Sequence, residues 1–315
     1  MTLKILVSDG LAEAGLQLLR SVGEVTSNSK ITADELIAAM PAYDALVVRS
    51  RTKVNAKVIQ AGTNLKVIGR AGVGVDNIDV PAAVAKGITV VNSPLAASVA
   101  VAEHTLGLLL ALARMIAAAD ASMKQGKWEK SAFMGSELSG KTLGLIGLGR
   151  IGAMVAGRAV AFGMSVVAYD PYLSDSQISE RNASPSKFEE VLTQSDYISL
   201  HLPLTKETRS LLSTAEFAKM KPGARLVCAA RGGVVDEAAL RAALDSGHLA
   251  GAALDVFADE PPQPNSIATH PKVIATPHVG AQTAEAQTRA GIAIAEEVVA
   301  VLQGKEPRWK VTSNE

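Results

Sequence analysis

The sequence predicts an α/β protein built from two doubly wound parallel-sheet domains of Rossmann-like or flavodoxin-like type. Short apolar runs rich in β-branched residues alternate with helical stretches along the chain. Most of these runs are unbroken, as expected of strands that helices cover on both faces. A glycine-rich turn begins at Gly147, almost halfway along the 315 residues. A complete series of strands therefore precedes the turn, which indicates that a second domain is inserted into the first.

The composition fits this class and excludes several functions. Hydrophobic residues make up 48% of the chain, which excludes disorder, and the formal net charge is zero. No basic excess points to nucleic acid or to a membrane surface. The longest charge-free run after His104 is Thr105–Ala113, far shorter than the roughly 20 residues that span a bilayer. A single cysteine, Cys228, fits a reducing compartment, so we expect a cytoplasmic protein.

The first series of elements precedes Ser98. Its expected strands are LKILVS from Leu3, ALVV from Ala45, KVIG from Lys66 and ITVVN from Ile88. Its expected helices are LAEAGLQLLRSV, TADELIAAM and AAVAKG. Thr32 and Glu35 have the spacing of a capping box. A single long buried helix, SVAVAEHTLGLLLALARMIAAA, then begins at Ser98.

The second series begins at Thr142. Its expected strands are TLGLIG from Thr142, SVVAY from Ser165, DYISL from Asp196, RLVC from Arg225, GAALDV from Gly251 and KVIAT from Lys272. Gly163 and Gly247 stand where helices between these strands should end. A final helix, QTAEAQTRAGIAIAEEVVAVLQGK, can return to the first series. We therefore expect a substrate domain of residues 1–97 and 285–315, a nucleotide domain of residues 98–284, and a ligand in the cleft between them.

The stretch LGLIGLGRIG places Gly147, Gly149 and Gly152 in a G-x-G-x-x-G pattern between a strand and a helix. Such glycines permit a tight turn and close approach of a pyrophosphate to the helix N-terminus. Asp170 ends the next strand, at about the spacing of the acid that binds the adenosine ribose. No Arg or Lys follows in PYLSDS, which favours NAD over NADP. The alternative is a tight glycine turn beside a solvated aspartate.

Histidine is the usual proton carrier near neutral pH, and His278 and His201 both follow strands in Pro-containing loops. These two rank nearly equal on the sequence. His104 lies mid-helix, where packing or a helix–helix hydrogen bond is expected. Arg231 follows a strand and precedes two glycines, where an arginine can bind a carboxylate with two hydrogen bonds.

Seven motifs occur in order: GRAGVGVDN, GLGRIG, the Tyr-Asp-Pro after it, HLPLT, ARGGVVDE, ALDVFADEPP and TPHVGAQT. Together they resemble the D-isomer-specific 2-hydroxyacid dehydrogenases over nearly the whole chain. Within that family the sequence is most similar to the members that oxidise 3-phosphoglycerate, the first step of serine biosynthesis. The resemblance implies an NAD-dependent oxidoreductase without a metal, and a homodimer formed through the nucleotide domain and the segment 98–140.

The resemblance also implies roles for individual residues. The catalytic set is Arg231, Glu260 and His278, with Arg231 on the substrate carboxylate and carbonyl, His278 as acid and base, and Glu260 holding it charged. Asp255 would contact the nicotinamide carboxamide. The cofactor contacts are Gly147, Gly149, Arg150, Ile151, Gly152, Asp170, His201, Leu202, Pro203, Ala229, Ala230, Asp255, His278, Gly280 and Ala281. The substrate contacts are Arg49, Ser50, Arg70, Val73 and Gly74.

Two departures from the family pattern matter. The chain ends at KVTSNE soon after the last helix, so we expect that the serine-binding regulatory domain is absent and that serine does not inhibit. Lys130 is followed by Ser131 and Ala132, where other members can place more cations. The phosphate site is then either thinner or shifted to Arg49, Arg51 and Lys53, which could equally form a solvated loop.

Two other functions remain open on the sequence. One is a reductase for hydroxypyruvate, glyoxylate or another small 2-keto acid. The other is an NAD(H)-sensing binding protein of the corepressor type, because such proteins share this fold and these residues. Turnover with NADH and 2-keto acids separates the two classes.

Overall fold

The computed structural model describes residues 2–312. The chain divides into two compact units, residues 1–97 with 281–315 and residues 98–280. We expected the return to the first unit at Glu285, in the first turn of the last helix, whereas this division places it at Ala281. Each unit contains one parallel sheet, and the two sheets confirm the predicted fold class.

The first unit has five strands in the order β2-β1-β3-β4-β5. They are β1 (Leu3–Val7), β2 (Gly23–Ser27), β3 (Ala45–Val48), β4 (Val67–Arg70) and β5 (Thr89–Asn92). The helices are α1 (Glu13–Arg20), α2 (Ala33–Ala39), the 3₁₀ helix η1 (Met40–Ala42), α3 (Ala56–Ala61), α4 (Val80–Ala85) and α12 (Ala284–Leu302). The predicted capping box of Thr32 and Glu35 begins α2. This strand order is that of flavodoxin-like sheets.

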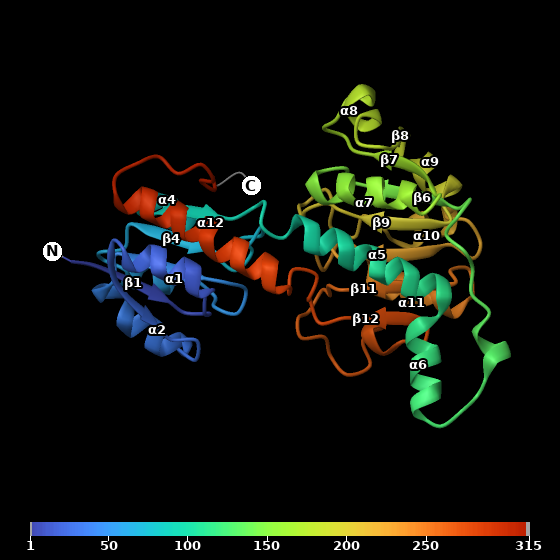
Figure 1. Cartoon of the computed structure of the whole chain (residues 1–315), viewed down its shortest axis with the longest axis horizontal. Helices are drawn as coiled ribbons and strands as arrows, with labels where there is room; N and C mark the ends of the chain where they lie inside the picture. The colour runs from blue at the N-terminus through green and yellow to red at the C-terminus, as the bar shows by residue number, and fades with distance from the viewer. Residues whose placement is uncertain (1, 313–315) are drawn as a thin grey trace. The chain divides into compact units, whose positions relative to one another are not determined.

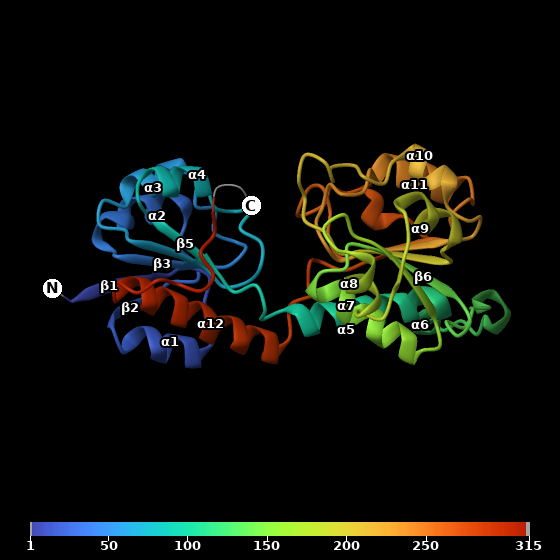
Figure 2. The same cartoon turned by 90° about the horizontal axis from the view of Figure 1, so that it is seen from above.

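Helices cover both faces of this sheet, as the unbroken apolar strands predict (Figure 2). Ile5 faces the core beneath α1 and α12, and its neighbour Leu6 faces the core on the opposite side. Helix α12 lies alongside α1 (Figure 1). The two helices approach so closely that a Cβ atom on Gly15 would lie 2.4 Å from the carbonyl oxygen of Gly291. The last helix thus completes the first unit.

The second unit has seven parallel strands in the order β12-β11-β10-β9-β6-β7-β8. They are β6 (Thr142–Ile146), β7 (Ser165–Tyr169), β8 (Ser184–Pro185), β9 (Tyr197–Leu200), β10 (Arg225–Cys228), β11 (Gly251–Leu254) and β12 (Val273–Ala275). The order reverses at β6, the first strand of the unit, as in a Rossmann fold. Ligands of such sheets bind outside the carboxyl ends of the strands at this reversal.

Its helices also cover both faces of the sheet (Figure 2). They are α5 (Ser98–Arg114), α6 (Ile116–Lys124), η2 (Lys130–Phe133), α7 (Arg150–Ala161), α8 (Asp175–Ser179), α9 (Phe188–Gln194), α10 (Thr214–Lys219), α11 (Glu237–Asp245) and η3 (Ile267–Thr269). Gly163 and Gly247, which follow α7 and α11, have positive φ, as predicted for residues that end helices. Cys228 is buried at the end of β10.

The single long helix predicted from Ser98 is wrong. The helix is interrupted at Met115, which has a φ of 54°, and α5 and α6 are bent by 67° relative to each other. Helix α5 buries most of its residues, whereas α6 buries only Ser122. The apolar sequence therefore continues past the point where the core ends.

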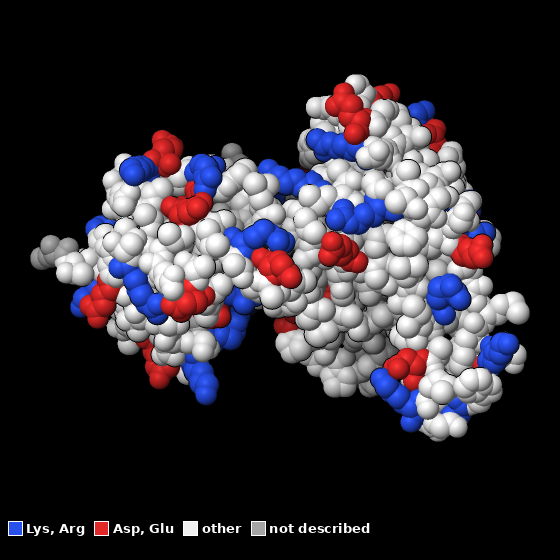
Figure 3. Space-filling model, viewed as in Figure 1, with Lys and Arg blue, Asp and Glu red and all other residues white. Residues whose placement is uncertain are grey.

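Charged side chains of both signs are interspersed over the face seen in Figure 3. Among the described residues, no single helix has the length and apolar composition of a membrane span; the bent pair α5 and α6 meets these criteria only when taken together.

Candidate active site

The predicted cofactor and catalytic residues of the second unit all follow the carboxyl ends of its strands. Gly147 follows β6, Asp170 follows β7 and His201 follows β9. Ala229, Ala230 and Arg231 follow β10, Asp255 and Glu260 follow β11, and His278 follows β12. Because all six strands are parallel, these residues share one edge of the sheet.

The glycine turn leaves an open cradle at the start of α7. Gly147 has a φ of 88°, and a Cβ there would lie 2.4 Å from the His201 carbonyl oxygen. A Cβ on Gly152 would lie 2.5 Å from the Gly147 carbonyl oxygen. A Cβ on Gly149, by contrast, would meet no described atom within 4 Å. No described side chain caps α7, so its first amides face this open space beside Arg150 and Ile151. The cradle fits the pyrophosphate of a dinucleotide.

Asp170 braces this turn from β7. Its carboxylate accepts hydrogen bonds from the amides of Leu148 (2.8 Å) and Tyr172 (3.0 Å). Arg181 donates to the Leu148 carbonyl oxygen over 2.6 Å. A carboxylate has about four acceptor positions, so Asp170 can also accept ribose hydroxyls. Arg181 was not predicted to lie near this turn, because it comes after the segment PYLSDS that follows Asp170.

The loop after β9 closes against the glycine turn. The imidazole of His201 is partly buried, and desolvation lowers its pKa to about 4. Its Nε2 lies 2.9 Å from the Ser199 hydroxyl oxygen. Leu202 and Pro203 follow, and the Pro203 carbonyl accepts a hydrogen bond from Thr208. His201 is therefore neutral near pH 7, and its loop forms a wall beside Gly147.

His278 and Glu260 form a pair. Nδ1 of His278 lies 2.8 Å from Oε2 of Glu260, and their side chains are 45% and 38% exposed. The other Glu260 oxygen accepts a hydrogen bond from the Phe257 amide over 3.2 Å. Desolvation acts to raise the pKa of Glu260. The hydrogen bond from His278, the charge of His278 and the hydrogen bond from the Phe257 amide together outweigh this effect, so the pKa of Glu260 is lowered. The carboxylate stays ionised beside a ring that solvent can reach.

Asp255 holds the loop that carries His278. Its buried carboxylate accepts hydrogen bonds from the Thr276 hydroxyl (2.6 Å) and from the amides of Val279 and Gly280 (both 2.8 Å). Nε2 of His104, on α5, lies 3.2 Å from the Thr276 hydroxyl and 3.4 Å from Asp255. Desolvation raises the pKa of Asp255, but these hydrogen bonds lower it below its ordinary value.

For His104 we expected packing or a helix–helix hydrogen bond; its hydrogen-bonding partners instead follow strands β11 and β12. Sequence reasoning missed Thr276 and this network. A contact of Asp255 with the nicotinamide carboxamide stays a prediction.

Arg231 lies in a loop that approaches the loop after β11. A Cβ on Gly232 would lie 1.7 Å from the Phe257 carbonyl oxygen, so glycine is required there. The Arg231 guanidinium donates to the Ala230 carbonyl over 2.7 Å and makes further contacts. Arg231, the residue predicted to bind the substrate carboxylate, thus follows β10, and Glu260 follows the neighbouring strand β11.

The predicted substrate residues belong to the first unit, again after the carboxyl ends of strands. Arg49 and Ser50 follow β3, and Arg70 ends β4. Val73 and Gly74 lie in the following loop, where the side-chain amide nitrogen of Asn92 donates a hydrogen bond to the Val73 carbonyl oxygen over 2.7 Å. Asn92 was not predicted as part of this site, although it ends the neighbouring strand β5.

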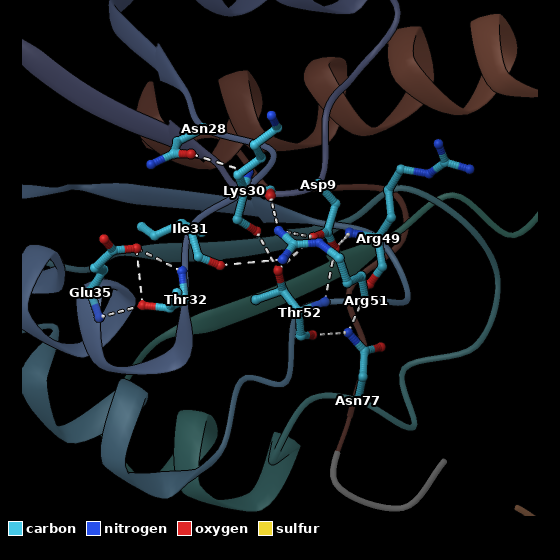
Figure 4. Close-up of polar contacts among 11 residues, drawn as sticks. Asp9, Asn28, Lys30, Ile31, Thr32, Glu35, Arg49, Arg51, Thr52 and Asn77 are labelled. Atoms are coloured by element: carbon cyan, nitrogen blue, oxygen red, sulfur yellow. Dashed lines mark hydrogen bonds and ion pairs between the residues drawn. The ribbon is translucent and has the colours of Figure 1, made fainter. Parts of the chain in front are cut away.

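The cations of this unit differ in how they are used. Arg51 forms an ion pair with Asp9 (3.0 Å) and donates to the carbonyl oxygens of Ser8 and Ile31. Figure 4 shows the Arg51 side chain turned into this cluster and the Arg49 side chain leaving it. Burial lowers the pKa of Arg49, and the charge of Asp9 opposes this. Lys53 is exposed, as is Lys130 on η2 of the other unit.

Comparison with known protein families shows which family the chain belongs to. Residues 106–280 match the model for the D-isomer specific 2-hydroxyacid dehydrogenase, NAD binding domain. The chain belongs to this family. The match covers the glycine turn, Asp170 and the loops through Gly280, so this part of the protein is an NAD-binding domain.

Individual relatives agree with the family assignment. Curated proteins named D-3-phosphoglycerate dehydrogenase are 46% identical (Synechocystis, 98% of this chain and 56% of the relative) and 50% identical (Methanocaldococcus jannaschii, 96% and 58%). The chain thus spans little more than half the length of these relatives. A structure of D-lactate dehydrogenase from Aquifex aeolicus, complexed with NAD and lactic acid, has a TM-score of 0.83 and 29% identity. The match covers 95% of this chain and 96% of that one.

Proposed function

We propose that this protein is an NAD-dependent dehydrogenase that interconverts 3-phosphoglycerate and 3-phosphohydroxypyruvate. The observation that carries the dehydrogenase chemistry is the His278–Glu260 pair, 2.8 Å long, at the carboxyl edge of an NAD-binding sheet. The glycine-rich cradle follows β6 of the same parallel sheet, so the pair and the cradle lie beyond the same ends of its strands. Because corepressor-type proteins share these residues, turnover of a 2-keto acid is what separates the enzyme from an NAD(H)-sensing binding protein.

The chain's own residues handle the proton and the substrate charges. NAD, when bound in the cradle, would supply the acceptor for the hydride that leaves C2 during oxidation. Because Nδ1 of His278 is bound to Glu260, Nε2 takes the proton of the C2 hydroxyl, and in reduction it returns that proton to the carbonyl oxygen. Glu260 stabilises the imidazolium that forms. Arg231 binds the substrate carboxylate with charge-assisted hydrogen bonds.

The residues that we assign to NAD follow from the cradle. Gly147, Gly149 and Gly152 admit the pyrophosphate to the start of α7, and Asp170 accepts the adenosine ribose hydroxyls. A 2′-phosphate would face that carboxylate. Arg181, the nearby cation, is engaged with the Leu148 carbonyl. NAD is therefore preferred to NADP.

The phosphorylated substrate is proposed from the curated relatives and from Arg49. Those relatives are named for 3-phosphoglycerate, and the similarity extends through the first unit. With Arg231 on the carboxylate, the phosphate needs another cation. Arg49 leaves the cluster in which Arg51 is engaged (Figure 4). Val73 and Gly74 seat the carboxylate with their backbone amides.

A homodimer formed through the second unit is the proposed assembly. Large apolar side chains are exposed on α6 and the segment after it, including Trp128 (81%) and Met134 (86%). Such side chains are unusual on a monomer surface when they gather on one segment. Sedimentation of the wild type as a dimer, and of Trp128→Glu as a monomer, would support this interface; a monomeric wild type would refute it.

A cytoplasmic location is proposed because the one cysteine is a buried thiol. Cys228 is a buried free thiol, and burial raises its pKa to about 11, so little of it is thiolate near neutral pH.

The test of the function is steady-state kinetics with NADH across matched 2-keto acids. We expect 3-phosphohydroxypyruvate to have a higher kcat/KM than hydroxypyruvate and glyoxylate. Turnover that is best with an unphosphorylated acid would replace the substrate assignment with the reductase. Binding of NADH without turnover of any acid would replace the enzyme with the binding protein.

A further inference from the structure

Asp9 holds the loop after β3 from one side, largely through hydrogen bonds to the backbone of the loop. This residue follows β1, and its side chain is 3% exposed. Its carboxylate accepts hydrogen bonds from the amides of Arg49 (2.7 Å) and Thr52 (3.1 Å), from the Thr52 hydroxyl and from Arg51. Two carboxylate oxygens thus satisfy four donors of one short loop. The buried charge is compensated, as a stable buried carboxylate requires.

Asn77 holds the same loop from its other side (Figure 4). Its side-chain amide donates to the carbonyl oxygens of Arg49 (2.8 Å) and Thr52 (2.7 Å). Asn77 is itself buried, and its backbone carbonyl oxygen accepts a hydrogen bond from the Val54 amide over 2.8 Å. The backbone at both Arg49 and Thr52 is therefore bonded through its amide and through its carbonyl.

This clamp separates the two arginines of the loop. Arg51 returns its guanidinium to Asp9 and to two carbonyl oxygens, so its charge and donors serve the fold. The Arg49 side chain leaves the clamp, and its one hydrogen bond among the described residues, to Gln282, is long at 3.5 Å. The loop has a fixed backbone and one cation with donors to spare.

We propose that Asp9 and Asn77 are positioning residues that aim Arg49 at the phosphate of the substrate, while Arg51 braces the clamp and does not touch the substrate. This inference rests on the proposed function. A long arginine side chain loses conformational freedom when it binds an ion, and a fixed backbone reduces what must be ordered at that moment. The clamp therefore acts on the affinity for the phosphorylated acid and not on the hydride-transfer step.

The test compares Asp9→Asn with Asp44→Asn, a matched change in the same unit. Asp44 precedes β3, accepts a hydrogen bond from the Lys4 amide (2.9 Å) and pairs with Lys66 (3.0 Å). For Asp9→Asn we expect KM for 3-phosphohydroxypyruvate to rise roughly 10-fold, the lower end of the loss for a hydrogen bond to a charged group, with kcat unchanged. KM for hydroxypyruvate should stay within about 2-fold, and Asp44→Asn should change neither substrate's KM.

A second variant and a double mutant protect the test against misfolding. Asn77→Ala should reproduce the selective rise in KM, because it releases the loop carbonyls without touching Asp9. In an Arg49→Ala background, Asp9→Asn should cause no further loss with the phosphorylated acid, because the two residues act as one unit. Additive losses, or equal losses on both acids, would overturn the proposal.

Hydrogen–deuterium exchange distinguishes this proposal from the proposed function. The amides of Arg49 and Thr52 should be protected in the wild type without any ligand and exchange faster in Asp9→Asn. Fast exchange in the wild type refutes the clamp whatever the substrate is. Protected amides together with a wild type that prefers hydroxypyruvate refute the proposed substrate, and with it the aim at a phosphate.

Discussion

His278 and His201 differ in what surrounds their imidazole rings. His278 is 45% exposed and paired with Glu260, whereas burial lowers the pKa of His201 to about 4. We predict that His278→Gln retains NADH binding and lowers kcat by a factor on the order of 10² to 10⁴, the usual contribution of a general acid or base. His201→Gln should cost far less. Stopped-flow turnover and NADH fluorescence titration measure both, and the reverse ranking would refute the assignment.

Asp170 should decide the choice of cofactor. Its carboxylate repels a 2′-phosphate and also braces the glycine turn through the Leu148 amide. We predict that Asp170→Ala weakens NADH binding and narrows the preference over NADPH, because both effects disappear together. The ratio of kcat/KM with the two cofactors measures this. Equal use of both cofactors by the wild type would contradict it.

Asp255 should contribute to stability in a pH-dependent way. Its pKa is lowered in the folded protein, so the contribution is complete above the unfolded value near 3.9 and is lost as the pH falls through the folded value. We predict that Asp255→Asn is less stable at pH 7 by about 1–3 kcal/mol, the cost of unmade buried hydrogen bonds. Denaturant melts should show the difference shrinking below about pH 4. A difference that is constant with pH would mean that the carboxylate charge does not matter.

Residue-scale prediction succeeded where a side chain directly follows a strand. Arg231, Asp255 and His278 could be placed at one edge because the strands are parallel. Thr276, His104 and Arg181 could not be assigned their partners, because their hydrogen bonds join residues far apart in sequence. No local spacing marks such contacts.

At the scale of elements, the two unpredicted strands, β2 and β8, are edge strands that carry little apolar sequence. β2 (GEVTS) buries none of its residues fully, and both residues of β8 are exposed. Their pairing with β1 and β7 decides their conformation, and a sequence pattern cannot show it. The short helices α3, α8, α9 and α10 were not predicted either. Five to seven residues give little periodicity, so helices of this length are detected in some cases, as α2 and α4 were, and missed in others.

The turn between β6 and α7 gives a prediction with an internal control. A Cβ on Gly147 would lie 2.4 Å from the His201 carbonyl, whereas one on Gly149 would meet no described atom within 4 Å. We predict that Gly147→Ala lowers the melting temperature and abolishes NADH binding. Gly149→Ala should melt within a few degrees of the wild type, since a surface change costs about 0.5 kcal/mol or less, yet bind NADH weakly. Calorimetry and NADH titration separate the two. Wild-type affinity in Gly149→Ala would show that the pyrophosphate lies elsewhere.

At the scale of the whole molecule, the sequence predicted two parallel-sheet units and the return of the last helix. It did so because both strand series and the final apolar helix are visible as separate patterns. The close packing of that helix against α1 could not be predicted, because Gly15 and Gly291 are far apart in sequence and approach each other only in the folded protein. In our account the second unit carries hydride transfer and the first unit selects the substrate.

That division of labour is tested most directly by the ratio of kcat/KM for 3-phosphohydroxypyruvate to kcat/KM for hydroxypyruvate, in the wild type and in Arg49→Ala. A hydrogen bond to a charged group contributes roughly 1.5–3 kcal/mol, or about 10- to 150-fold. We predict that the wild type prefers the phosphorylated acid and that Arg49→Ala lowers this ratio by about that factor, leaving hydroxypyruvate almost unaffected. A wild type that prefers hydroxypyruvate, or equal losses on both acids in Arg49→Ala, would contradict the account.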